Sequence, residues 1–291
     1  MIISLYVLIL TSISCSLLGV FLILRKISML TDAISHTVLL GIVIAYFFVR
    51  DLSSPFLIVG AASTGLLTVI LVELLGKSKL AKYEDAIGII FPVLFSIAVI
   101  LISRYFSSVH LDIDIVLLGE VVFASLIKTT VFGIEVHKAI LHGAIMLFII
   151  LTFIIVFYKE LKTSTFEPEY AALLGIPTGF IFYSLMTLTS FTSVVSFNNV
   201  GGILVISFFI APAATALLLS KRLHHALILS AIISVFNCTI AYLLAVHFNA
   251  SMSGMCAFIN TITYLSVLIF TKLYKEKKVE RSKYDKRSSN I

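Results

Sequence analysis

Two ionisable residues inside an apolar stretch are the first candidates for chemistry in this sequence. Asp32 and His36 lie four residues apart within Met29-Leu-Thr-Asp-Ala-Ile-Ser-His-Thr-Val-Leu-Leu-Gly41. If this stretch is helical, the spacing places a carboxylate and an imidazole on one face, about one turn apart, where both could bind one ion. Oxygen and nitrogen ligands suit Mn²⁺, Fe²⁺ or Zn²⁺, and the absence of a thiolate or thioether cluster disfavours Cu(I).

Burying these two groups in an apolar segment has a cost that favours a functional role. An isolated Asp near the centre of a membrane helix costs about 2.5–3.5 kcal/mol, so such residues usually face a bundle interior or an aqueous path. The alternative is that Asp32, after Thr31, caps the helix while His36 is a satisfied interior residue. Both interpretations stay open at this point. A metal site would also need further ligands from a second copy of the chain, backbone carbonyls, other side chains or water.

A second group of possible ligands lies in the middle of the chain. In an extended conformation His110, Asp112 and Asp114 alternate along one side, which gives an imidazole and two carboxylates, and Glu120 follows. Such a group could collect a cation at a pore mouth. The alternative is a solvated loop before a helix with an acidic cap. We expect an electrostatic or gating role for these residues and not a tight site.

The elements that must position these residues are membrane helices. The chain is 60% hydrophobic and only 12% charged, which leaves too few polar groups to cover a water-facing surface. Apolar runs long enough to span a hydrocarbon core recur along the chain. The predicted spans are 3–24, 30–49, 54–76, 86–103, 139–158, 178–196, 199–219, 224–247 and 250–271.

The basic residues predict the orientation of these spans. They gather in alternate connections and in a tail: Arg25-Lys26, Lys77, Lys79 and Lys82, Lys159 and Lys162, Lys221-Arg222, and Lys272–Arg287. Cytoplasmic connections carry an excess of Lys and Arg, so we expect the N-terminus outside and the C-terminus in the cytoplasm. The net charge of +6 is therefore a topology signal, and no nucleic-acid partner is expected.

Two segments depart from simple spans. Residues 104–138 contain an apolar run that is short and interrupted by polar residues, which favours an external re-entrant or interfacial element. Between Thr165 and Pro177, Pro168 near a start and Gly175 after an end predict a short cytoplasmic helix. The fold expected is all-α and polytopic, with about eight or nine transmembrane helices in a domain over residues 1–274, and a basic cytoplasmic tail over 275–291.

The remaining motifs exclude other functions. Cys15, Cys238 and Cys256 each stand alone in an apolar run, so they are interpreted as packing residues and not as a disulfide framework or thiolate site. The chain has no phosphate-binding loop, zinc-protease motif or nucleophile elbow. We therefore expect a transport subunit and not an enzyme, with energy supplied by a partner or by an ion gradient.

Several short motifs, in order along the chain, carry a resemblance to a known family. They are Leu24-Arg25 with Met29-Leu-Thr-Asp-Ala-Ile-Ser-His36, Asp85-Ala-Ile-Gly88, His110-Leu-Asp-Ile-Asp114 with Leu118-Gly-Glu120, Phe166-Glu-Pro-Glu-Tyr-Ala-Ala-Leu-Leu-Gly175, and Val200-Gly-Gly-Ile-Leu-Val-Ile with Ala211-Pro-Ala-Ala-Thr-Ala216. With them, almost the whole chain resembles the ABC-3 family of metal-ion permeases, the membrane subunits of bacterial manganese, zinc and iron importers. The manganese-type members are the most similar.

The resemblance implies an assembly in the bacterial plasma membrane. It implies a pair of permease subunits, such as a homodimer, with two cytoplasmic ATPase subunits and an extracellular metal-binding lipoprotein or periplasmic protein. A divalent metal ion would be the transported substrate, and no permanently bound cofactor is implied. Two positions depart from the family pattern: Thr31 stands where many relatives carry glycine, and Leu40 where many carry proline.

The resemblance also implies roles for particular residues. Asp32 and His36 would coordinate the metal within the membrane. The stretch after Phe166 would be the coupling helix that docks on the ATPase, through Glu167, Glu169, Tyr170, Ala171 and Gly175.

Two questions remain open from the sequence. A proton-coupled secondary transporter would use Asp32, Glu120 and the histidines as a proton relay. It predicts inverted repeats, and no convincing internal repeat is present. Nitrogen and oxygen ligands also serve Mn²⁺, Zn²⁺ and Fe²⁺ alike, so the residues favour no one of these metals.

Overall fold

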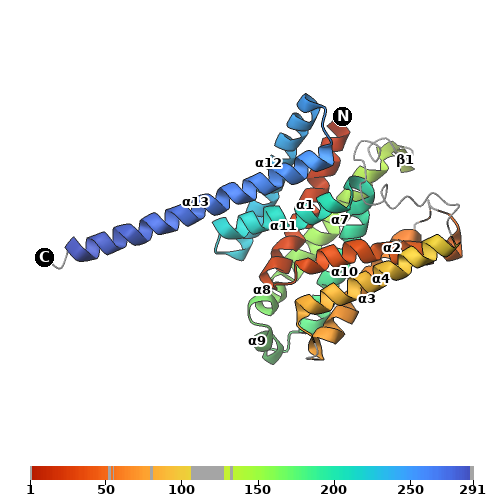
Figure 1. The fold of residues 1–291 in the computed structure, drawn as a ribbon, viewed down its shortest axis with the longest axis horizontal. Coiled ribbons are helices and arrows are strands. Elements are labelled where there is room, and N and C mark those ends of the chain that lie inside the picture. Colours follow the sequence, from red (N-terminus) through yellow and green to blue (C-terminus); the bar gives the residue numbers. More distant parts are fainter. Residues whose placement is uncertain are drawn as a thin grey trace.

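The fold is a bundle of long helices, taken from a computed structural model that describes residues 2–51, 54, 56–78, 81–105, 128–131 and 134–288. The order of elements is α1 (Ile2–Leu24), α2 (Met29–Val49), α3 (Phe56–Lys77), α4 (Tyr83–Tyr105), β1 (Lys128–Val131), β2 (Ile134–His137), α7 (Lys138–Val156), α8 (Tyr158–Phe166), α9 (Pro168–Leu173), α10 (Thr178–Val200), α11 (Gly202–Leu219), α12 (Leu223–Phe248) and α13 (Met252–Ser288). Figure 1 shows α13 extending away from the rest of the bundle toward the C-terminus.

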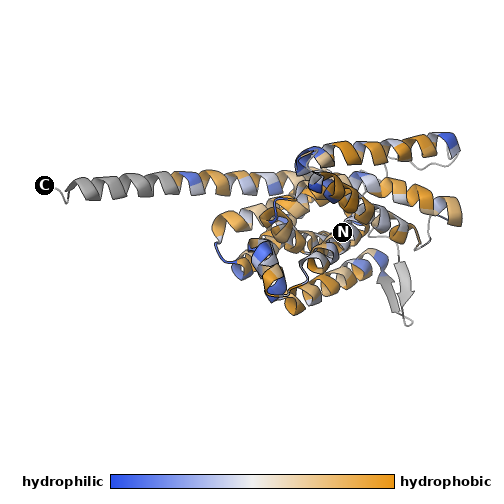
Figure 2. Cartoon of the chain, turned by 90° about the horizontal axis from the view of Figure 1, so that it is seen from below, coloured by the Kyte–Doolittle hydropathy of each residue, from blue (hydrophilic) through white to orange (hydrophobic). Residues whose placement is uncertain are grey.

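The predicted membrane helices are confirmed. Within the described part of the chain, nine helices are long and apolar enough to cross a membrane. Each coincides with a predicted span, although the ends differ by a few residues. Hydrophobic residues dominate the helices, and hydrophilic residues gather at helix ends and connections (Figure 2). This distribution follows from the solvent, because a lipid core accepts apolar side chains and leaves no water to pair with the backbone.

The helices form two adjoining groups. The first is centred on α1, which packs against α7, α11 and α12, with α13 covering α11 and α12. The second group contains α2, α3 and α4, and α10 packs against α2, α3 and α1 and so joins the two groups. In Figure 1, α2, α3, α4 and α10 lie together on one side of the bundle. The residues of the candidate metal site belong to this second group.

Small residues let α2 and α3 approach closely. A Cβ atom added at Gly41 would lie 2.2 Å from the backbone oxygen of Gly60, far inside van der Waals contact. The Thr68 and Thr37 hydroxyl oxygens lie 2.7 Å apart across the same interface. Membrane helices associate through such close packing and interhelical hydrogen bonds, because there is no hydrophobic driving force for helix association within lipid. These contacts fix α2 against α3.

Buried polar side chains join helices elsewhere in the bundle. The Asn237 amide on α12 donates to Asn260 Oδ1 on α13 at 2.8 Å, and the Asn260 amide donates to Ser207 Oγ on α11 at 3.1 Å. On the other side, the Ser190 hydroxyl of α10 donates to the Ala62 carbonyl of α3 at 2.9 Å. Each polar group thereby finds a partner inside the protein, as lipid burial requires.

The region between α4 and α7 contains an element that the sequence did not predict. Strands β1 and β2 form an antiparallel hairpin in which Lys128 pairs with His137 and Val131 with Ile134. The prediction of a re-entrant or interfacial segment over 104–138 falls largely outside the described residues, and so do His110, Asp112, Asp114 and Glu120. The described residues on either side are the end of α4 at Tyr105 and the start of α7 at Lys138.

The cysteines behave as packing residues. Cys15, Cys238 and Cys256 are all buried and form no disulfide. Cys15 lies 3.5 Å from the Ser196 hydroxyl, and Cys238 points its sulfur at the Leu8 carbonyl at 3.7 Å. Cys15 and Cys238 belong to the buried contacts around α1, and Cys256 on α13 belongs to the same hydrophobic core.

The close approach of α2 and α3 leads to a first testable prediction. Gly41→Ala should destabilise the bundle by about 1–3 kcal/mol, because the added methyl group would force the two helices apart. Thermal unfolding of the detergent-purified protein measures this as a lower midpoint. Gly88→Ala on α4 is the matched control, because a Cβ atom there meets nothing within 4 Å. Equal midpoints for the two variants would contradict the prediction.

Candidate functional site

The candidate site lies in the first turns of α2. This helix begins at Met29, so Asp32 is already inside it and Ser28 occupies the N-cap position without a side-chain capping hydrogen bond. The Thr31 hydroxyl instead donates to the Ser28 carbonyl at 2.7 Å. Asp32 therefore does not cap the helix, and the capping alternative fails. The carboxylate is still well placed in the first turn, where the helix dipole favours negative charge.

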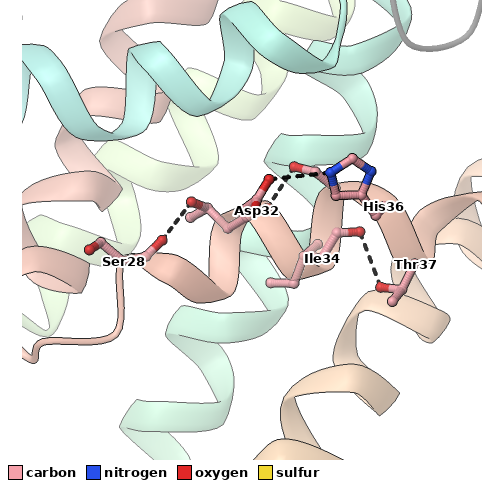
Figure 3. Close-up of polar contacts among 7 residues, drawn as sticks. Ser28, Asp32, Ile34, His36 and Thr37 are labelled. Carbon is pink, nitrogen blue, oxygen red and sulfur yellow. Dashed lines mark hydrogen bonds and ion pairs between the residues drawn. The ribbon is translucent and has the colours of Figure 1, made fainter. Parts of the chain in front are cut away.

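Asp32 and His36 point toward one another along one face of α2 (Figure 3). The His36 Nε2 atom lies 3.4 Å from Asp32 Oδ1, and the two side chains are 34% and 39% exposed, respectively. The spacing of four residues produces this arrangement, as the sequence predicts. Both groups are therefore close together, only partly covered by protein and able to turn toward a shared ion.

Two aromatic rings of α4 hold the His36 imidazole. The Phe91 ring stacks on it at a centroid distance of 5.6 Å and an interplanar angle of 30°. The Phe95 ring meets it edge-on at 5.9 Å. Together these rings restrict the orientation of the imidazole, which favours a defined ligand geometry. These rings were not predicted from the sequence, although two phenylalanines four residues apart on a predicted span are a signal for them.

The hydroxyl groups beside the pair are already engaged. Ser35 donates to the Thr31 carbonyl at 2.6 Å, and Thr37 donates to the Ile34 carbonyl at 3.2 Å. Within the part of the chain that the structure describes, no third His, Cys, Asp or Glu joins the pair in a group suited to a metal. The described residues of one chain thus offer two side-chain ligands here, and a complete metal site would need further ligands.

The residues that the family resemblance assigns to ATPase docking lie on α9 and beside it, away from Asp32 and His36 in the sequence. Helix α9 begins at Pro168 and is followed by Gly175, whose φ of 77° is the left-handed conformation that glycine adopts most readily. The short helix predicted here is thereby confirmed. Glu167, Glu169 and Tyr170 are exposed on it, whereas Ala171 is buried.

Exposed apolar side chains surround these docking residues. Phe166, Leu173 and Leu174 all face outward, and Leu173 is 85% exposed. Exposed hydrophobic groups next to acidic ones on a short connecting segment are typical of a contact surface for another protein.

Comparison with known proteins places the chain among metal-ion transport proteins. The family described as "ABC 3 transport family" matches residues 1–271. The chain is 44% identical over 264 residues to the manganese transport system membrane protein MntD of Bacillus subtilis, covering 90% of this chain and 89% of the relative. It is 40% identical over 260 residues to the zinc transport system membrane protein TroD of Treponema pallidum, covering 89% and 71%.

A solved structure has the same architecture. PsaBC from Streptococcus pneumoniae, determined in complex with Fab, superposes with a TM-score of 0.74 at 27% identity, over 91% of this chain and 89% of that one. The similarity extends through both helix groups, since nearly the whole chain is matched.

The packing around His36 yields a second prediction. Phe91→Ala should make the imidazole more accessible, because the stacked ring at 5.6 Å is removed. The rate at which diethyl pyrocarbonate modifies His36, followed by mass spectrometry, should rise. Phe148→Ala on α7 is the control, since Phe148 is highly exposed and makes no ring contact with His36. An unchanged rate in Phe91→Ala would show that the ring does not shield the histidine.

Proposed function

The chain belongs to the ABC 3 transport family, and on this premise we propose that it is the permease subunit of an ATP-driven importer of a divalent transition metal, with Mn²⁺ as the favoured ion. The observation that carries the proposal is the Asp32–His36 pair, with 3.4 Å between ligand atoms on a membrane helix. A carboxylate and an imidazole suit the borderline and hard ions of this group. The chain itself is a transport component, and ATP is hydrolysed by a partner.

Manganese is favoured by similarity and not by geometry. The relative with 44% identity is named for manganese transport, but relatives named for zinc and for chelated iron match at 40% and 28%. The same two ligand types serve all three metals. Selection among them depends on the number and placement of the ligands that complete the site.

We expect partners that supply what this chain lacks. An extracellular metal-binding protein would deliver the ion, and two ATPase subunits would provide the energy, since the sequence holds no nucleotide-binding motif. A second copy of the permease would form a homodimer and bring a second Asp32–His36 pair. A symmetric pair of sites, or water and backbone carbonyls, would then raise the ligand number above two.

A contact on one side of the bundle supports the expected orientation. The Arg25 side chain, in the connection between α1 and α2, donates to Ser164 and Thr165 of α8, which precedes α9. The α1–α2 connection and residues 166–175, called the docking segment below, therefore share one side of the membrane. If α9 meets a cytoplasmic ATPase, the N-terminus lies outside, which agrees with the basic residues of the connections. The chain is a multi-pass protein of the plasma membrane, with its tail over 275–291 expected in the cytoplasm.

The path of the ion follows from this orientation. Asp32 lies within the first turn of α2, near the cytoplasmic end of that helix. The ion would enter past the external segment that holds His110, Asp112, Asp114 and Glu120, and would then be held by Asp32 and His36. Movement of the ATPase subunits against α9 would switch access from one side to the other.

Replacing either ligand gives a third prediction. Asp32→Ala and His36→Ala should each lower Mn²⁺ accumulation about tenfold or more, because loss of a ligand weakens metal binding strongly. Accumulation is measured in cells that carry the complete transporter, at matched expression. Glu84→Gln and His247→Gln are the controls, since both of these residues are exposed at helix ends. Normal accumulation by both alanine variants would refute the site assignment.

The docking surface gives a fourth prediction. Leu173→Asp should reduce co-purification of the ATPase with the permease about tenfold, because it places a charge in an apolar contact. Quantitative pull-down from detergent extracts measures the effect. Leu219→Asp, at the exposed end of α11, is the control for a new charge on an exposed leucine at a helix end. Full ATPase recovery with Leu173→Asp would place the docking surface elsewhere.

A further inference from the structure

Arg25 connects the metal-binding half of the bundle to the docking segment. Its Nη2 atom donates to Ser164 Oγ at 2.8 Å, and its Nε atom donates to Thr165 Oγ1 at 3.1 Å. Both partners belong to the last turn of α8, and only Glu167 separates α8 from α9. The positive charge also lies at the C-terminal end of α8, where the helix dipole attracts it. The α1–α2 connection is thus attached directly to the element that precedes the docking helix.

Holding a cation in this place has a cost, which favours a specific role over simple packing. Burial lowers the pKa of the Arg25 guanidinium from its ordinary value. Among the described residues, the partners recorded for Arg25 are the hydroxyls of Ser164 and Thr165, and desolvation, with no carboxylate, is the cause of its pKa shift. Two neutral hydroxyls hold it instead. A shorter apolar residue would fill the position without this desolvation cost.

The turn between Arg25 and α2 is stiff. The Lys26 amide donates to the Ile23 carbonyl at 3.0 Å, the Ile27 amide to Leu22 at 2.9 Å, and the Leu30 amide to Ile27 at 3.0 Å. Ile27 is buried, and Lys26 is fixed at a φ of 60°. A displacement of α8 that moves Arg25 would therefore be passed to the first turn of α2, which carries Asp32.

A second contact joins α10, the helix that follows the docking segment, to α3. The Tyr183 hydroxyl, on the second turn of α10, donates to Glu73 Oε2, and Lys77 pairs with the other oxygen of Glu73. Helix α10 begins at Thr178, a few residues after α9 ends. The sequence predicts the Glu73–Lys77 pair from its spacing of four residues, and this pair is confirmed. The Tyr183 contact bridges distant parts of the chain and was not predicted.

The Tyr183 contact lies at the same depth as Asp32. Thr37 and Thr68 meet across the antiparallel α2–α3 interface. Asp32 lies five residues before Thr37, and Glu73 lies five residues after Thr68, so both lie about 7.5 Å along the helix axes from that threonine pair. The helices on either side of α9 therefore make two contacts: α8 holds Arg25, before the start of α2, and α10 holds Glu73 of α3, level with Asp32.

We propose that Arg25 and Tyr183 are positioning residues that transmit movement of the docking segment to α2 and α3, and so couple ATP hydrolysis to release of the ion from Asp32 and His36. This proposal rests on the proposed function. Neither residue contacts the ion. Arg25 acts through hydrogen bonds from the α1–α2 connection to α8, and Tyr183 through a hydrogen bond from α10 to Glu73 of α3.

The test separates coupling from folding, docking and metal binding. Arg25→Lys keeps the positive charge but loses the forked geometry that reaches two hydroxyls at once. Tyr183→Phe removes only the hydroxyl. The complete transporter is reconstituted in liposomes with its ATPase and its metal-binding protein, and Mn²⁺ import and ATP hydrolysis are measured together. Lys26→Gln, an exposed neighbour of Arg25, and Tyr264→Phe on α13 are the matched controls.

The expected result is a lower number of ions imported per ATP hydrolysed. In the Arg25→Lys, Tyr183→Phe double variant this ratio should fall about tenfold. An effect of this size is typical when the energetic coupling between two sites is lost. ATPase co-purification and nucleotide-free Mn²⁺ binding should stay within about twofold of wild type. Both control variants should keep the wild-type ratio.

Three outcomes would overturn the proposal. An unchanged ratio would show that the contacts do not couple the two events. Loss of ATPase co-purification would make them docking contacts, and loss of nucleotide-free metal binding would make them supports of the ligand geometry. Failure of the proposed function is seen separately, because Asp32→Ala would then import Mn²⁺ normally whatever the double variant does.

Discussion

The absence of water inside a lipid core is the constraint on which the rest of this structure depends. A polar group that enters the core must find its partner within the protein, or its burial costs several kcal/mol. Serine and threonine side chains meet this demand by donating to carbonyls of their own helices, as Thr189 and Thr215 do. Asp32 and His36 are different, because one partner for each leaves much of their bonding capacity unused. Buried polar atoms without a partner also occur in the described residues, for example on Ser12, Ser193 and Asn199, so Asp32 and His36 differ from their surroundings in being ionisable and partly exposed.

Much of the fold and part of the candidate site could be predicted from the sequence, because the signals are local. Apolar runs of about 20 residues define membrane helices regardless of what surrounds them. A spacing of four residues brings Asp32 and His36 together on any helix, and the proline and glycine that bound α9 act within a few residues of themselves. Predictions of this kind depend only on backbone geometry.

The features that sequence reasoning missed depend on tertiary contacts. The stacking of Phe91 on His36 requires α4 to lie beside α2, and the hydrogen bonds from Arg25 to α8 join residues about 140 positions apart. Hydropathy places helices in the membrane but does not select their neighbours. That selection comes from small residues at the interfaces, such as the glycines where α2 meets α3, and from the few polar groups that cross between helices.

The proposed site, with two side-chain ligands from the described part of each chain, has a consequence for how fast cargo can pass. An ion held by few side chains keeps part of its hydration shell, so it loses little on arrival and has little to regain on departure. A closed cage of four or more side chains would bind more tightly and hold each ion longer, which slows every cycle. Under the proposed function, the two ligands in α2 would trade retention for throughput and would leave stringent discrimination among ions to the steps that precede entry into the membrane.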